Sequence, residues 1–105
     1  MFNIYPDISL AIHYAKKWHP NETRRILFID TSATQANGVA RDFFGDDSVY
    51  ILDFYNPLSP PKDTEARQGI HLEVTVGDFD NDDSYISKIR HNVSLAISSF
   101  TPELI

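Results

Sequence analysis

The residues best placed to do chemistry lie in one short polar segment. Asp30 ends an apolar run that starts at Arg25, and residues 31–38, TSATQANG, follow it directly. A short apolar run of this kind is typical of a buried parallel strand, and parallel strands present functional side chains at their carboxyl ends. The position of Asp30 therefore favours a functional role. The alternative is that its carboxylate only caps the following loop through hydrogen bonds.

Other acidic and histidine residues favour structural roles. Asp78, Asp80 and Asp82 have the spacing of a calcium loop. Such a loop needs a glycine at its sixth position and a glutamate at its twelfth, where this chain has Asp83 and Ile89. We interpret the three acids as the solvated N-terminus of a helix, where they oppose the positive end of the dipole. The histidines fall on separate predicted elements without i, i+4 spacing and predict no metal site: His13, His19, His71 and His91.

Hydrophobic periodicity predicts the elements that must position this segment. Apolar residues at helical spacing predict a first helix with Asp7 as its N-cap, and a long apolar stripe predicts a last helix. Continuous or alternating apolar runs predict strands between them. The predicted elements are helix 7–18, strand 25–30, short helix 39–44, strand 49–55, an irregular loop with three prolines at 56–62, strand 70–76 and helix 85–100.

Composition limits the classes of protein to which the chain can belong. The chain has 105 residues, of which 42% are hydrophobic and 23% are charged, so we expect one small globular α/β domain or part of one. It has no cysteine, which excludes disulfides, zinc ribbons and thiol chemistry. A formal charge of −6 argues against autonomous nucleic-acid binding. Neither a signal peptide nor a spanning helix is indicated, so we expect a soluble intracellular chain.

The last five residues predict a turn followed by the start of another strand. Thr101 and Pro102 break the long helical stripe, and Glu103, Leu104 and Ile105 follow. A strand that begins and does not finish is typical of a truncated domain. We therefore expect residues 1–105 to form a single partial domain.

Several segments together resemble the zinc-dependent histone deacetylases. Residues 30–38 resemble that family's Asp-x-Asp-x-His-(Gln or His)-Gly-(Asn or Asp)-Gly motif. Further blocks resemble its small class IV group in the same order along the chain: 2–12, 41–43, 49–56, 66–67 and 102–104. The resemblance covers nearly the whole chain. It implies the central portion of a deacetylase-like domain, with a partial arginase/deacetylase-like fold of three α/β/α layers around a mostly parallel sheet.

The resemblance also implies roles for single positions. The family's second motif Asp and its His bind the catalytic zinc, and Ser32 and Thr34 occupy those two positions here. Asp30 matches the family's Asp that lies behind the zinc ligands and binds an alkali cation. Phe2 corresponds to a Phe lining the acyl-lysine tunnel. By the same resemblance, the family's tandem His pair would precede Met1 and its third zinc ligand would follow Ile105.

The substituted positions predict loss of the family's chemistry. Catalytic zinc needs three protein ligands and an open position for water, and its ligands must be anionic or imidazole donors. We therefore expect no catalytic residue, complete metal site or cofactor in this chain, although full-length relatives use zinc. The predicted function is that of a class IV deacetylase-like chain that is inactive on its own, as a pseudoenzyme or a fragment. The alternative is a non-catalytic protein-interaction module that retains part of the fold.

Partners and location follow from the resemblance alone. Intact relatives remove acyl groups from lysine in chromatin and other proteins, so acetylated lysine substrates are expected only for them. For this chain we expect protein partners, no direct contact with nucleic acid or membrane, and a nuclear or cytoplasmic location rather than secretion.

Overall fold

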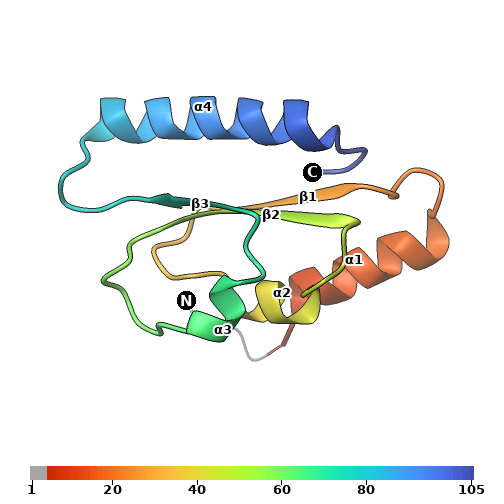
Figure 1. The fold of residues 1–105 in the computed structure, drawn as a ribbon. Coiled ribbons are helices and arrows are strands. Elements are labelled where there is room, and N and C mark those ends of the chain that lie inside the picture. The colour runs from red at the N-terminus through yellow and green to blue at the C-terminus, as the bar shows by residue number, and fades with distance from the viewer. Residues whose placement is uncertain (1–4) are drawn as a thin grey trace.

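The computed structural model describes residues 5–105, which form a parallel sheet between two helical layers (Figure 1). Helix α4 covers one face of the sheet, and α1, α2 and α3 cover the other. This arrangement confirms the predicted α/β fold class with its three layers. The elements, in chain order, are α1 (Asp7–Trp18), β1 (Ile26–Asp30), α2 (Asn37–Asp42), β2 (Val49–Tyr55), α3 (Thr64–Arg67), β3 (Leu72–Thr75) and α4 (Asp82–Phe100).

The sheet within residues 5–105 has the order β1-β2-β3, and both strand pairs are parallel. The pairing of β1 with β2 ends where Asp30 lies beside Asp53. In the pairing of β2 with β3, Asp53 lies beside Glu73. Side chains that are paired in register point to the same face of a sheet. Three carboxylates from three strands therefore form a row near the carboxyl ends.

Each face of the sheet carries its own apolar core, because successive strand residues point to opposite faces. β2 contributes to both cores, which explains why its sequence is almost continuously apolar. The core beneath α1, α2 and α3 consists of Ile12, Ile26, Ala40, Phe43, Val49, Ile51 and Ala66. The core beneath α4 consists of Leu27, Leu52, Phe54 and Ala96, with Tyr50, Ile89, Val93 and Phe100 packed against it.

Two short helices differ from the sequence prediction. Helix α2 begins at Asn37 rather than residue 39 and ends at Asp42, which leaves Phe43 as a buried C-cap residue. Helix α3 lies between the proline-rich loop and β3 and was not predicted. Its start is stabilised by the Asp63 side chain, which accepts a hydrogen bond from the Ala66 N–H at 2.9 Å. A four-residue helix is too short to show a hydrophobic period.

The start of α1 also corrects the sequence prediction. Asp7 is the first helical residue, and the N-cap position is occupied by Pro6, which makes no side-chain cap. The Asp7 carboxylate instead accepts a hydrogen bond from the N–H of Ile8 at 2.9 Å. Its negative charge still lies in the first turn, where it opposes the positive end of the helix dipole.

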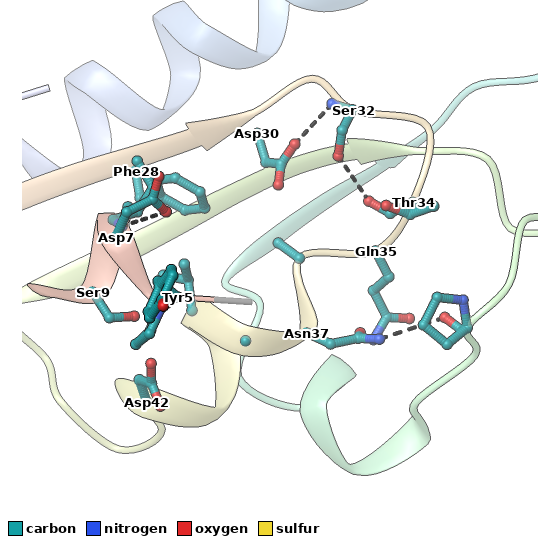
Figure 2. A pocket seen from close by; sticks show the side chains of 16 residues that line it. Tyr5, Asp7, Ser9, Phe28, Asp30, Ser32, Thr34, Gln35, Asn37 and Asp42 are labelled. Atoms are coloured by element: carbon teal, nitrogen blue, oxygen red, sulfur yellow. Dashed lines mark hydrogen bonds between the residues drawn. The ribbon is translucent and has the colours of Figure 1, made fainter. Parts of the chain in front are cut away.

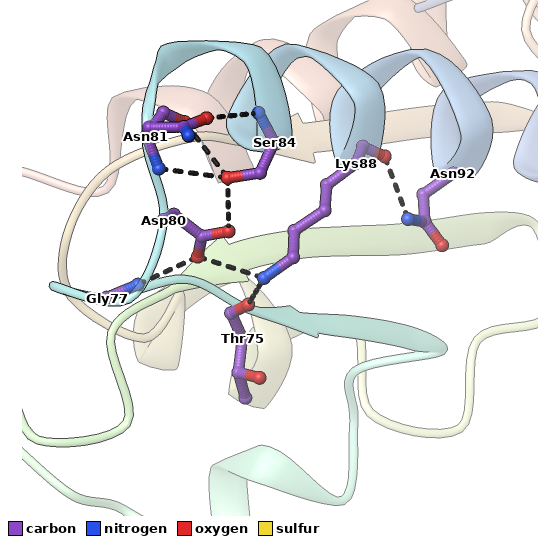
Figure 3. A network of polar contacts seen from close by, with 7 residues as sticks. All are labelled: Thr75, Gly77, Asp80, Asn81, Ser84, Lys88 and Asn92. Carbon is purple, nitrogen blue, oxygen red and sulfur yellow. Dashed lines mark hydrogen bonds and ion pairs between the residues drawn. The ribbon is translucent and has the colours of Figure 1, made fainter.

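The start of α4 is held by a connected set of polar contacts (Figure 3). Asn81 and Ser84 form a reciprocal capping box, and α4 therefore begins at Asp82, three residues before the predicted start. The Asp80 carboxylate accepts hydrogen bonds from Ser84 Oγ and Lys88 Nζ, both at 2.9 Å. Because its side chain is only 8% exposed, Asp80 is not the solvated acid we expected. It is an internal anchor between β3 and α4.

The C-terminal residues return to the edge of β1. Thr101 ends α4 in a left-handed conformation, with φ 49°. The Glu103 N–H then donates to the Arg25 carbonyl at 2.8 Å, and the Leu27 N–H donates to the Leu104 carbonyl at 2.9 Å. Ile26 and Leu104 form one isolated parallel bridge, which lies where the strand start is predicted, and no strand is formed after α4 within residues 5–105. None of the helices in residues 5–105 has the length and apolar character needed to cross a membrane.

Candidate functional site

A pocket of about 520 Å³ opens at the carboxyl end of β1 (Figure 2). Its walls come from the start of α1, the end of β1, the following loop and α2. The side chains that give it its character are carboxylates, hydroxyls and amides, with aromatic rings on one side: Asp7, Asp30, Asp42, Ser9, Ser32, Thr34, Gln35, Asn37, Tyr5 and Phe28. Asp30, Ser32 and Thr34, the three positions singled out in the sequence, therefore line one cavity.

Local hydrogen bonds hold the loop that follows β1. The Ser32 N–H donates to Asp30 Oδ1 at 2.7 Å, and Ser32 Oγ donates to the Thr34 carbonyl at 3.1 Å. Asp30 thus caps this loop, as the structural alternative predicted, while its side chain also lines the pocket. The two roles are compatible because a carboxylate can accept several hydrogen bonds.

The opposite wall is fastened to the proline-rich loop. Gln35 Nε2 donates to Asn37 Oδ1 at 2.6 Å and to the Asp63 carbonyl at 2.8 Å. The Asn37 side chain also donates to the Pro61 carbonyl at 3.5 Å. Because segments 24 to 28 residues apart are joined in this way, the shape of the wall depends on the packing of α2 against α3.

Asp53 is a buried acid next to the pocket that sequence reasoning missed. It is fully buried in β2, where its Oδ2 accepts a hydrogen bond from the Ala36 N–H at 2.8 Å. Its Oδ1 has no hydrogen-bond partner within residues 5–105. Burial raises the pKa of Asp53 to about 7, the hydrogen bond from Ala36 opposes that rise, and the nearby charges of Asp30 and Glu73 add to it. A single acid inside the apolar run VYILDFY was the available signal.

The third carboxylate in the row is neutralised by its own partners. Glu73 pairs with Arg67, with an N–O distance of 2.6 Å, and accepts a hydrogen bond from the Tyr55 hydroxyl at 2.8 Å. The contact with Arg67 lowers the pKa of Glu73 most, and the Tyr55 hydrogen bond lowers it further. Among residues 5–105, Glu73 therefore has a cationic partner, whereas Asp53 has none and tends to keep its proton.

The histidines take no part in the pocket lining. His13 packs against Phe43 with tilted rings whose centroids are 5.0 Å apart, and His71 stacks on Tyr50 at 4.9 Å. Within residues 5–105, no three His, Cys, Asp or Glu side chains are grouped so that they could hold a metal ion. Phe2, assigned by resemblance to a tunnel wall, lies outside the described residues. What the pocket provides is a set of polar groups for hydrogen bonding and two aromatic surfaces.

Comparison with known proteins identifies the family to which this fold and the motif at the end of β1 belong. Residues 2–105 match the model of the histone deacetylase domain, so the chain belongs to the histone deacetylase family. The chain is 38% identical over 104 residues to histone deacetylase 2 of Arabidopsis thaliana, an alignment that covers 99% of this chain and 26% of that relative. It is also 28% identical over 113 residues to the acetoin utilization protein AcuC of Bacillus subtilis (strain 168), covering 99% of this chain and 28% of AcuC.

These comparisons confirm the family that the sequence motifs predicted. The chain spans about a quarter of the length of the two relatives. The class IV assignment and the roles of Asp30, Ser32 and Thr34 stay predictions.

Proposed function

We propose that these 105 residues form a non-hydrolytic part of a class IV deacetylase-like domain. The observation that carries the proposal is the chemistry of the pocket at the end of β1. Ser32 and Thr34 line it at the two positions where the family motif has an aspartate and a histidine. By this proposal the chain keeps the family's scaffold and lacks its hydrolysis.

The donor set does not fit a catalytic zinc ion. A serine or threonine hydroxyl is neutral at physiological pH, whereas zinc sites need thiolate, carboxylate or imidazole ligands. The Ser32 hydroxyl is also committed as a donor to the Thr34 carbonyl. Of the motif positions, only Asp30 offers an anionic oxygen to the pocket. One carboxylate and two hydroxyls cannot replace three strong ligands, so these residues do not form a catalytic zinc site.

We assign Asp30 the alkali-cation role that the family motif implies. The support comes from the neighbouring strand, where Asp53 lies in register with Asp30 and has an oxygen without a partner among the described residues. Carboxylate oxygens suit hard cations, and a buried anion is costly unless a positive charge compensates it. When bound, such an ion would supply that charge between β1 and β2.

Partners and location form part of the same proposal. The family match and the acidic composition favour contacts with other proteins rather than nucleic acid, since phosphate binding needs clustered basic residues. We propose a nuclear or cytoplasmic location, on the strength of the class IV resemblance.

Zinc titration followed by calorimetry tests this function. We expect no sub-micromolar binding of zinc at neutral pH and no turnover of an acetyl-lysine peptide by the 105-residue chain. A full-length family deacetylase, measured in parallel, checks both assays. Sub-micromolar zinc binding that is lost in Asp30→Asn, or peptide hydrolysis that a chelator abolishes, would overturn the proposal.

A further inference from the structure

His71 and Ile51 are joined by two hydrogen bonds where β3 approaches β2. The His71 N–H donates to the Ile51 carbonyl at 3.0 Å. The Ile51 N–H, in turn, donates to the imidazole Nδ1 of His71 at 3.0 Å. The Nδ1 atom of His71 thus accepts the hydrogen bond that a main-chain carbonyl oxygen would accept in a regular ladder between β2 and β3. Regular pairing follows immediately, from Leu52 with Leu72 onward.

This contact requires one protonation state of the imidazole. A main-chain N–H can only donate, so Nδ1 must carry a free lone pair and the ring proton must lie on Nε2. Addition of a second proton would set two N–H groups against each other. Ile51 is fully buried, so its amide would lose its acceptor with no access to water. A buried donor without a partner is destabilising.

The surroundings of the ring favour its neutral form. His71 stacks on Tyr50 at an interplanar angle of 23°, and Tyr50 contacts Phe100 of α4 with ring centroids 5.2 Å apart. Partial burial lowers the pKa of His71, and the charge of Asp47 in the turn before β2 opposes that change. Tyr50 on β2 and Asp47 are the titratable groups facing the ring, and Phe100 of α4 is uncharged. The outer side of His71 is exposed, so protons have access to it.

β3 is the strand that depends most on this contact. It has four residues, shorter than β1 or β2, and it pairs on one side only within residues 5–105. Its residues are exposed or half-buried, whereas β2 is almost wholly buried. Segments with few buried contacts open locally at low free-energy cost. Loss of one hydrogen bond at the start of β3 therefore weakens the strand that has the fewest buried residues in the described sheet.

We propose that the His71–Ile51 pair is a pH-sensitive switch, in which protonation of the imidazole releases the Ile51 amide and loosens β3 from β2. At neutral pH the pair closes the ladder. In mild acid the ring becomes a donor, and β3 together with Glu73 separates more often from the core strand. The inference concerns regulation of the fold and does not depend on the proposed loss of hydrolysis.

Amide exchange measured by NMR on the full chain tests the switch. In the wild type we expect the protection factor of the Ile51 amide to fall about tenfold or more between pH 7.5 and pH 5. In His71→Asn the carboxamide oxygen can accept the same hydrogen bond without titrating, so the protection should stay nearly constant. His91→Asn, an exposed position on α4, is the matched control and should behave like the wild type.

Imidazole nitrogen shifts of the wild type give an independent reading that needs no variant. We expect Nδ1 to be unprotonated at neutral pH and its protonation to follow the loss of Ile51 protection. Three results would each overturn the proposal: a proton on Nδ1 at neutral pH, protection of Ile51 that does not change down to pH 5, or an equal fall in protection in His71→Asn.

Discussion

The carboxylate of Asp53 accepts a hydrogen bond from the main-chain N–H of Ala36 at 2.8 Å, across 17 residues of sequence. The bond joins the core strand β2 to the residue just before α2 and so fixes the end of the pocket loop. Asp53 is fully buried, and one of its oxygens has no partner within residues 5–105. The folded state is therefore destabilised when this carboxyl group is charged.

The free energy of unfolding should depend on pH because of this destabilisation. The pKa of Asp53 is about 7 in the folded chain, above its ordinary value of 3.8. Between these values the unfolded chain has lost the proton and the folded chain has kept it, so stability from this group falls as pH rises from about 4 to 7. Asp53→Asn removes the titration. Its stability relative to wild type should therefore rise across this window, by up to about 4 kcal/mol.

Urea denaturation at pH 4.5, 6 and 8 measures this difference. The buffers should contain tetramethylammonium as the only added cation, so that alkali-metal binding does not compensate the charge. A stability difference between Asp53→Asn and wild type that stays constant over the three pH values would contradict the burial argument.

Two glycine substitutions should separate close packing from helix propensity. A Cβ on Gly69 would lie 2.5 Å from the main-chain oxygen of Ala40, so Gly69→Ala must displace α2 from the turn after α3. We expect it to lower the free energy of unfolding by about 1–3 kcal/mol. Gly38→Ala lies in α2, where the new Cβ would meet nothing within 4 Å beyond its chain neighbours and the backbone of its own helix, and it should be neutral or stabilising by up to about 1 kcal/mol.

Thermal and urea unfolding of the two glycine variants provide the measurement. Because both changes add the same methyl group, a difference larger than the roughly 1 kcal/mol that helix propensity can contribute at Gly38 reports the contact with Ala40. Equal stability of the two variants would show that α2 moves away freely.

Lys88 should stabilise the junction between β3 and α4. Its ammonium group donates to the Asp80 carboxylate and to the Thr75 carbonyl, both at 2.9 Å (Figure 3). Lys88→Met would leave the Asp80 carboxylate without its cation, and we expect a lower midpoint of urea unfolding at pH 7. Lys62→Met, at an exposed position, is the control and should change stability little.

Acid should weaken the same junction in the wild type. Lys88 is the main cause of the lowered pKa of Asp80, and this carboxylate therefore stabilises the fold above its ordinary pKa of 3.8. That stabilisation is lost as pH falls through the lower, folded-state value. The destabilisation by Lys88→Met should accordingly shrink below pH 4. A loss that persists unchanged at pH 3 would argue for a packing effect of the lysine stem.

Restoration of the two motif donors should not restore hydrolysis. The double variant Ser32→Asp with Thr34→His supplies a carboxylate and an imidazole at the positions where the family motif has zinc ligands. By resemblance the third ligand comes from outside these residues, so the variant should show no turnover of an acetyl-lysine peptide in the presence of zinc. Steady hydrolysis above the wild-type background would refute this expectation.

Much of the fold follows from local patterns in the sequence. The bounds of α1 and β2 match those predicted, because a helical period over 12 residues and a run of seven mostly apolar residues are strong local signals. The apolar stripe of α1 is only partly buried, since Ile12 lies in the core while Ile8 and Trp18 are exposed. Helix α4 starts three residues early because Asn81 and Ser84 form a capping box whose signal is polar rather than periodic. Helix α3 has four residues and depends on Asp63 and on packing against α2, so no window of sequence could reveal it.

The sequence by itself determined the family, the layered fold and the placement of Asp30 at a strand end, because motif order and periodicity are local properties. Only the tertiary structure decided which acid is buried and which atom His71 accepts from. Parallel register sets Asp53 beside Asp30 across 23 residues, and it sets Ile51 opposite His71 across 20. Strand pairing brings together residues that are far apart in the chain. Register, burial and hydrogen-bond geometry are therefore fixed only after the strands have paired.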